Sequence, residues 1–266
     1  MTAVVGVAMV KDEADVIAHT LSWMLKQVDH VIVADNGSMD GTREILDSLD
    51  VTVVDDPEAG YFQSRKMSAL AEMARVAGAD WVVPFDADEI HVCTGSIADG
   101  LMGLPDNILV SEAALFDHVV TGLDPVGDDN PVRRMAYRRA AQAPLRKVAV
   151  RAVEGVVIHQ GNHSAEFPGV KHPASVTDLM QVRHFPYRSV EQFVKKVRNG
   201  AAAYAATDLP PEAGAHWRQY GQILEDRGVA GIEEIFRTWF YRENPLEELV
   251  IHGEHQSALV HDPCPR

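Results

Sequence analysis

The chain has 266 residues, of which 46% are hydrophobic and 24% are charged, a composition that is typical of a globular protein and excludes extensive disorder. It contains 24 lysine and arginine residues against 39 aspartate and glutamate residues, so its formal net charge is −15. A chain with this acidic balance repels phosphate backbones, which argues against a nucleic acid as its partner.

The first 85 residues alternate between apolar runs and amphipathic segments. Apolar runs without a polar face predict buried strands, and residues with one apolar face at helical spacing predict helices. Asp12 is expected to cap the first helix. The expected strands are 3–10, 30–35, 51–54 and 81–85, and the expected helices are 12–28, 42–49 and 62–78. Such alternation predicts an α/β protein with a Rossmann-like, mostly parallel sheet that is flanked by helices.

The pattern after residue 89 is less regular. In chain order we expect a helix at 94–104, a strand at 107–116, loops at 117–144, strands at 147–153, 155–160 and 178–185, helices at 189–206, 211–227 and 230–242, and a tail over the last 20 residues. We expect residues 1–206 to form the main domain, and residues 207–266 to form a C-terminal helical extension that packs on it.

Three carboxylates follow the fourth expected strand, in the stretch WVVPFDADEIHV (81–92). The carboxylates of Asp86, Asp88 and Glu89 repel one another. Their closeness is tolerable if the strand end is open to solvent or if a cation is bound there. The strand period of two points Asp86 and Asp88 to the same side, where two carboxylates suit Mg²⁺ or Mn²⁺. A solvated loop that is acidic by chance is the plain alternative. The position beyond the carboxyl end of a parallel strand favours a ligand site.

The stretch FDADE resembles the D-x-D motif of family 2-like glycosyltransferases with the GT-A fold. Further stretches resemble other segments of that family, in chain order VKDEADVI, VADNGSMDGT, GYFQSRKMSAL, HQGNH and RHFPYRSVEQFVKKVRNGAAAY. The last two are similar to segments of a small bacterial subgroup. Asp12 stands where the family usually has asparagine, so the contact made at this position can differ. The resemblance covers residues 3–115 and 183–204.

The resemblance implies transfer of a sugar from a UDP- or GDP-type nucleoside diphosphate sugar to a hydroxyl or amine of a small-molecule or glycan acceptor, with inversion. It implies Mn²⁺ or Mg²⁺ as cofactor, because a metal offsets the charge that grows on the departing diphosphate. The implied metal ligands are Asp88, Asp86 and His184. The implied contacts of the nucleotide sugar are Val10, Asp12, Asp35, Asn36, Arg65, Lys66, Asp86 and Arg188.

The expected catalytic residues are Asp88, Glu166 and His163. An inverting reaction needs a base that takes a proton from the acceptor. No motif identifies this base, and Asp117 and Asp178 are alternatives to Glu166.

Two further assignments stay open in the sequence. His159 and His163 are alternatives to His184 as the histidine of the metal site. Aromatic side chains near the C-terminus could stack on a sugar, but packing in the core is the simpler interpretation for Trp217, Trp239, Phe240 and Tyr241.

Three other functions compete with glycosyl transfer. A D-x-D phosphohydrolase would use Asp86 as nucleophile, but such enzymes carry the motif on the first strand of their fold. A nucleotidyltransferase would carry a glycine-rich loop after its first strand, where this chain reads VKDEAD. A non-catalytic sugar-nucleotide-binding or scaffold protein would be expected to lack the pair formed by Asp86 and Asp88.

The two cysteines, Cys93 and Cys264, fit no metal-ligand spacing and predict reduced thiols. The sequence has no apolar stretch long enough to span a bilayer, and the N-terminus lacks the basic region of a signal peptide. A cytoplasmic location is therefore expected, and a homodimer is compatible with the sequence.

Overall fold

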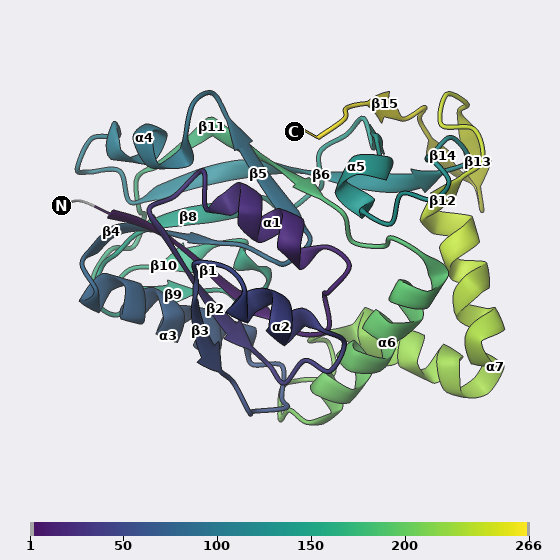
Figure 1. Cartoon of the computed structure of the whole chain (residues 1–266), viewed down its shortest axis with the longest axis horizontal. Helices are drawn as coiled ribbons and strands as arrows, with labels where there is room; N and C mark the ends of the chain where they lie inside the picture. Colours follow the sequence, from purple (N-terminus) through teal and green to yellow (C-terminus); the bar gives the residue numbers. More distant parts are fainter. Residues whose placement is uncertain (1–2, 265–266) are drawn as a thin grey trace. The chain divides into compact units, whose positions relative to one another are not determined.

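The structure is a computed structural model that describes residues 3–264 (Figure 1). These residues form two compact units, which are described separately. Unit 1 contains residues 3–57, 63–116 and 142–184, and unit 2 contains residues 58–62, 117–141 and 185–264. The units divide the chain at positions other than residue 206, and a separate helical extension over 207–266 stays a prediction.

Unit 1 alternates strands and helices through most of its length (Figure 1). Strand β6 passes from unit 1 into unit 2 after Phe116. In chain order the elements are β1 (Ala3–Val10), α1 (Ile17–Met24), β2 (His30–Asp35), α2 (Thr42–Asp47), β3 (Thr52–Asp55), α3 (Gln63–Val76), β4 (Ala79–Pro84), β5 (Glu89–Cys93), α4 (Ile97–Met102), β6 (Val110–Thr121), β8 (Lys147–Arg151), β9 (Val157–Ile158), the 3-10 helix η1 (Gln160–Asn162), β10 (Ala165–Glu166) and β11 (Ser175–His184).

Four parallel strands form the part of the sheet that the sequence predicted most clearly. Their order is β3-β2-β1-β4. The register places Val10 of β1 level with Asp35 of β2, which is level with Asp55 of β3. Strand β8 pairs antiparallel with β4 and with the first residues of β6, and β5 pairs antiparallel with β11. The predicted α/β class, a sheet with a parallel core that is flanked by helices, is confirmed.

Two clusters of buried side chains cover the two faces of this sheet. Val4 and Ala8 of β1 belong to one cluster, and Val5 and Val7 belong to the other. Successive side chains of a strand point to opposite faces, so β1 must be apolar on both. Helices α1, α2 and α4 contribute to the first cluster, and α3 contributes to the second.

The first helix begins later than predicted. Helix α1 starts at Ile17, and its N-cap residue Val16 makes no capping bond through its side chain. Asp12 has a φ of 56° and turns to the loop after β2 instead. Its amide donates to Ser38 Oγ at 3.0 Å, and its Oδ1 accepts from the Met39 amide at 2.8 Å. The capping role predicted for Asp12 was wrong, because the residue binds a distant loop in place of a helix end.

Unit 2 is built from a helical pair and short strands (Figure 1). Helices α6 and α7 pack together through Phe193 and Val197 of α6 and Ile232 and Phe236 of α7. Besides the end of β6, the elements are α5 (Pro131–Arg134), β7 (Tyr137–Arg138), α6 (Val190–Ala205), α7 (Ala215–Trp239), β12 (Tyr241–Arg242), β13 (Leu249–Ile251), β14 (Glu254–Gln256) and β15 (Val260–His261).

The C-terminal segment is more ordered than the sequence predicted. The two helices expected at 211–227 and 230–242 correspond to the two parts of α7, which are separated by the non-helical backbone of Gly228, where φ is 65°. The expected tail contains strands instead, since β13 pairs with β14 and β15 pairs with β7. Within residues 3–264, no helix combines the length and the apolar character that crossing a membrane requires.

We expect the buried His91 of β5 to make the protein sensitive to acid. Burial, and then the nearby Lys147, lower the pKa of His91 to about 3. The unfolded chain takes up a proton near pH 6.5, so this contribution to stability is complete above pH 6.5 and is lost as the pH falls. Between pH 7.5 and 5, His91→Gln should reduce the loss of unfolding free energy by about 2 kcal/mol. Urea denaturation of the parent protein and of His91→Gln at pH 7.5 and at pH 5 measures this difference. An equal loss of unfolding free energy in both proteins would contradict the prediction.

Candidate functional site

The D-x-D segment forms a turn between β4 and β5. The Glu89 amide donates to the Asp86 carbonyl oxygen at 3.1 Å, and the Asp86 amide donates to Glu89 Oε2 at 3.1 Å. The strand period of two therefore does not apply to Asp86 and Asp88, and the geometric argument that placed both carboxylates on one side was wrong. The turn instead directs the acids to different partners.

Asp86 is held by a buried lysine that the sequence analysis missed. Lys147, the first residue of β8, is 3% exposed. Its Nζ lies 2.7 Å from Asp86 Oδ2, 2.6 Å from Glu89 Oε1 and 2.8 Å from the Gly161 carbonyl oxygen. One ammonium group therefore joins both ends of the D-x-D turn to the segment HQGNH.

Two neutral side chains hold the other oxygen of Asp86. Gln63 Nε2 and Asn162 Nδ2 donate to Asp86 Oδ1 at 3.1 Å and 3.2 Å. Gln63 Oε1 accepts from the Gly161 amide at 2.7 Å, so the first residue of α3 binds both the acid and the segment beside it. Both carboxylate oxygens of Asp86 thus have donors from the protein itself.

The charges in this cluster depend on one another. Burial, and then repulsion from Asp86, raise the pKa of Glu89 to about 7, although Lys147 opposes the shift. Burial disfavours the charged form of Lys147, but the carboxyl groups of Asp86 and Glu89 outweigh this and hold the pKa of Lys147 above its usual value. Lys147 therefore stays an ammonium ion at neutral pH.

Asp88 faces a different neighbour. Its side chain is 4% exposed, and its Oδ1 lies 3.7 Å from Nε2 of His184. His184 ends β11 and pairs with Glu89 in the antiparallel ladder between β11 and β5. The structure therefore brings together Asp88 and the histidine that was expected as a metal ligand.

We tested this pair against the needs of a divalent cation. Among residues 3–264, no cluster of three or more histidine, cysteine or acidic side chains is arranged to hold a metal by itself. Mg²⁺ and similar ions, however, are often bound by one or two carboxylates together with substrate phosphates and waters. Carboxylate oxygen and imidazole nitrogen suit such an ion, so Asp88 and His184 fit a site that the substrate would complete.

The residues expected to bind the nucleotide gather at the same edge of unit 1. The Asn36 amide donates to the Val10 carbonyl oxygen at 2.9 Å, and the Asn36 side chain donates to Asp56 Oδ2 at 2.9 Å. Lys66 Nζ donates to the same oxygen at 2.6 Å. Asp56 thus links Asn36 to Lys66, and the exposed Arg65 is the neighbour of Lys66 on α3.

Asp35 and Asp12 shape the loop that follows β2. Asp35 is 5% exposed, and its Oδ1 accepts from the Ser38 amide at 3.0 Å. Ser38 in turn accepts from the Asp12 amide. These bonds hold the loop against the ends of β1 and β2. A loop that encloses a ligand needs to be fixed in this way.

The remaining candidates lie apart from this edge or have other partners. His163 Nδ1 lies 2.7 Å from the Arg146 carbonyl oxygen, and burial, then Lys147, lower the pKa of this histidine. Glu166 lies on β10 with its side chain 75% exposed, 3.3 Å from His159. Arg188, in unit 2, is 1% exposed and donates to the Phe185 carbonyl oxygen at 3.1 Å. The catalytic and binding roles of these residues stay predictions.

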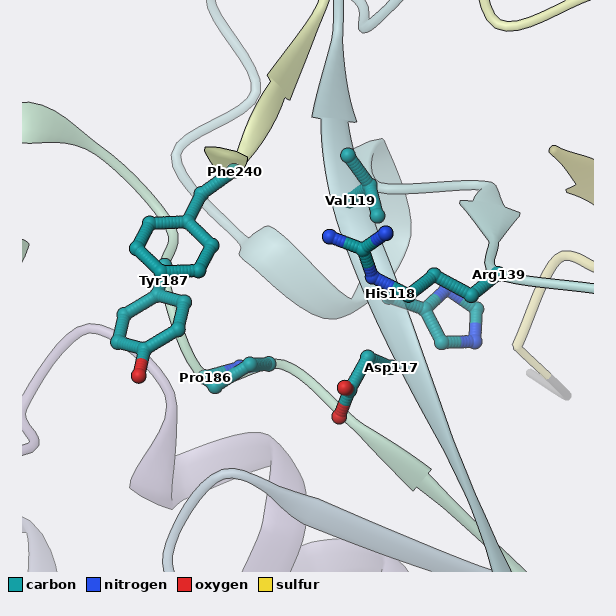
Figure 2. A pocket seen from close by; sticks show the side chains of 7 residues that line it. All are labelled: Asp117, His118, Val119, Arg139, Pro186, Tyr187 and Phe240. Atoms are coloured by element: carbon teal, nitrogen blue, oxygen red, sulfur yellow. The ribbon is translucent and has the colours of Figure 1, made fainter. Parts of the chain in front are cut away.

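Unit 2 contains a small pocket that one of the candidate bases lines (Figure 2). The rings of Tyr187 and Phe240 form one wall, with their centroids 3.9 Å apart. Asp117, His118 and Arg139 contribute the polar lining. Arg139 is fixed there because its guanidinium donates to Gln256 Oε1 at 2.8 Å and to the Trp239 carbonyl oxygen at 2.9 Å.

The residues of the candidate site that sequence analysis missed are Lys147, Gln63, Asn162 and Asp56. Asn162 precedes His163 and Gln63 lies two residues before Arg65, so closeness to these candidates was the available signal, whereas Asp56 lies near none of them. Lys147 opens the otherwise apolar run KVAV, and a cation at the start of a buried strand calls for an anionic partner. No local pattern indicates which acid that partner is.

Part of the chain matches a known family. Residues 7–92 match the model of glycosyl transferase family 2. Over 81 residues the chain is 33% identical to the TPR repeat-containing protein Synpcc7942_0270 of Synechococcus elongatus, and the match covers 30% of this chain and 19% of that protein. The chain thus spans about a fifth of the length of this curated relative.

Solved structures show weaker similarities. Glucosyl-3-phosphoglycerate synthase from Mycobacterium tuberculosis, in complex with Mn²⁺, UDP and glucosyl-3-phosphoglycerate, is 21% identical, with a TM-score of 0.33 over 43% of this chain and 44% of that chain. GalNAc-T7 with UDP, GalNAc and Mn²⁺ is 12% identical, with a TM-score of 0.41 over 90% of this chain and 58% of that chain.

The turn at Gly161 gives a prediction about stability. Gly161 and Gly169 have φ values of 74° and 73°, but a Cβ on Gly161 would lie 2.4 Å from the His163 ring, whereas one on Gly169 would meet open space. Gly169→Ala should lower the unfolding free energy by about 1–2 kcal/mol through backbone strain alone. Gly161→Ala should cost roughly 1–3 kcal/mol more, because the HQGNH segment must move. Urea denaturation measures both, and equal losses would show that the segment is loosely held.

Proposed function

Because residues 7–92 match the model of glycosyl transferase family 2, we propose that the protein transfers a sugar from a nucleoside diphosphate sugar to a hydroxyl or amine of an acceptor. One observation carries the proposal. The D-x-D turn and the chain of bonds through Asn36, Asp56 and Lys66 follow the carboxyl ends of neighbouring parallel strands in unit 1. Ligands of such sheets bind beyond that edge.

The donor contacts follow from this placement. Val10, Asp35 and Asn36, at the ends of β1 and β2, would receive the base and ribose, whose hydroxyl and amide groups suit carboxylate and amide partners. Lys66 and Arg65, in the first turn of α3, would bring positive charge to the diphosphate. This charge matters in a chain with a net charge of −15, which otherwise repels an anionic donor.

The proposed metal pair is Asp88 with His184. A divalent ion held there would offset the negative charge that grows on the departing nucleoside diphosphate. The protein's part is to keep the carboxylate and the imidazole side by side at the ends of two elements, the turn after β4 and strand β11. Asp86 has both oxygens bonded to donors of the protein, which makes it the weaker candidate for a direct ligand.

We place acceptor binding at the pocket of unit 2. The ring faces of Tyr187 and Phe240 suit the C–H face of a sugar or another small ring, and Asp117 can accept a proton or a hydrogen bond from a hydroxyl. Among the three candidate bases, Asp117 is the one that lines this pocket, whereas Glu166 and Asp178 are exposed. Glu166 is the alternative base.

The bonding of Asp86 also bears on the competing phosphohydrolase. A nucleophilic carboxylate needs an oxygen that a phosphorus atom can approach. Asp86 accepts from Lys147 on one oxygen and from Gln63 and Asn162 on the other. This arrangement favours a carboxylate that is held in place over one that attacks a substrate.

Donor binding should depend on Asp88. With Mn²⁺ present, Asp88→Asn should weaken UDP binding by more than the 10–100-fold that is typical of losing an outer partner of a metal ligand, because a direct ligand is lost. Titration calorimetry with and without chelator measures this. Asp50→Asn, which removes the same charge from an exposed loop of unit 1, should leave the affinity unchanged. Equal affinity of the parent protein for UDP in chelator and in Mn²⁺ would contradict the proposed metal site.

Catalysis should depend on Asp117 without a matching change in donor binding. Asp117→Asn should lower kcat by about 10²–10⁴-fold, because the base is lost while the side-chain shape is kept. Turnover of a nucleotide-sugar panel, with UDP affinity measured in parallel, tests this. Asp178→Asn is the matched control and should change neither quantity. A large loss of kcat in Glu166→Gln, with Asp117→Asn near the parent value, would assign the base to Glu166.

A further inference from the structure

Lys147 is a buried cation that donor binding, metal binding and proton transfer do not use directly. It reaches the D-x-D turn from β8, a strand that pairs with β4 on one side and with β6 on the other. In the ladder with β4, Arg151 lies level with Trp81 and Val150 with Val82. Continued in the same register, this ladder brings Lys147 level with Phe85, directly before the first acid of the turn.

We propose that Lys147 is a positioning residue for metal binding, which holds Asp86 and Glu89 as an internal counter-ion so that Asp88 is presented to the metal together with His184. The inference rests on the proposed function. It adds a reason why Asp88 would bind the metal while Asp86 and Glu89, in the same short turn, would not. Lys147 touches no substrate in this scheme and acts through the conformation of the turn.

The bonds around Lys147 account for this division of roles. Its ammonium donates hydrogen bonds to Asp86 Oδ2 and to the Gly161 carbonyl oxygen, and it forms an ion pair with Glu89 Oε1 at 2.6 Å. Gln63 and Asn162 occupy the second oxygen of Asp86. A metal that bound Asp86 would compete with these three donors, and Lys147 is too deeply buried to find another acceptor in water.

The position of Glu89 extends the argument to the metal pair. Glu89 is fully buried and is the partner of His184 in the ladder between β5 and β11. Fixing Glu89 therefore fixes the start of β5 beside the histidine. Asp88 precedes Glu89 directly, so the bond between Lys147 and Glu89 controls where the Asp88 backbone lies relative to His184.

Without the ammonium, the same residues would repel one another. Asp86, Asp88 and Glu89 place three acids within four residues, and two of them are buried. Loss of the counter-ion leaves a buried charge without a partner, which disfavours the closed turn. The turn would then open or draw a cation to Asp86 and Glu89, and either change removes Asp88 from its place beside His184.

The test compares Mn²⁺ binding in variants of the full chain. Lys147→Met keeps the length of the side chain and removes the charge. We expect the affinity for Mn²⁺ in the presence of UDP, measured by the electron paramagnetic resonance of free Mn²⁺, to fall by about 10–100-fold, the range for losing an outer partner of a metal site. Lys147→Arg restores the charge and should recover most of this loss. UDP binding in chelator should stay at the parent value, which a general loss of structure would not allow.

Two further variants keep the test decisive. Arg151→Met removes a cation from the same strand that lies outside the cluster, and it should leave Mn²⁺ affinity unchanged. If Lys147→Met fails to fold, Lys147→Met combined with Glu89→Gln removes one buried charge with its counter-ion, and the same loss of affinity is expected from it.

Three results would overturn the inference. Unchanged Mn²⁺ affinity in a folded Lys147→Met variant, or in the double variant when the single one does not fold, would show that Lys147 supports only the fold. Tighter Mn²⁺ binding would show that Lys147 competes with the metal for Asp86. Absence of Mn²⁺-dependent UDP binding in the parent protein would refute the proposed metal-dependent function itself, and the role of Lys147 with it.

Discussion

The structure of the candidate site depends on how like charges are kept together. Asp86, Asp88 and Glu89 lie in a single turn at the end of a buried strand, where water can screen them only in part. Lys147 satisfies two of these acids, and His184 lies beside the third. A cation of the protein itself is thus part of this acidic turn.

The sheet supplies the geometry that this cluster needs. The parallel strands β1 to β4 end at one edge, and the antiparallel strand β8 enters beside β4 with its first residue, Lys147, at that edge. Helix α3 then joins the two halves of the site, because Gln63 binds Asp86 and Lys66, one turn later, binds Asp56. A shift of α3 would therefore disturb the D-x-D turn and the bonds around Asn36 together.

Periodicity in the sequence was enough to predict the parallel strands and their helices, because burial on both faces of a sheet leaves a strong local signal. The errors arose where a residue's partner is distant in sequence. Asp12 was expected to cap the next helix but binds the loop after β2, and the expected tail pairs with β7 through β15. The candidate site also contains residues that a local pattern indicates and residues whose partners are distant in sequence. Asp88 and His184 were identified by resemblance, whereas Lys147 is 61 residues from Asp86 and no local pattern joins them.

The different surroundings of Asp86 and Asp88 change what a D-x-D motif predicts. Two acids at that spacing look equivalent in a sequence, and a strand would indeed present them alike. In this chain a turn separates them, and the side chains that surround each acid set what it can do. Asp86 is bonded on both oxygens by Lys147, Gln63 and Asn162, whereas Asp88 lies beside the imidazole of His184. The surroundings of the two aspartates are therefore set by β8 and the HQGNH segment as well as by the motif itself.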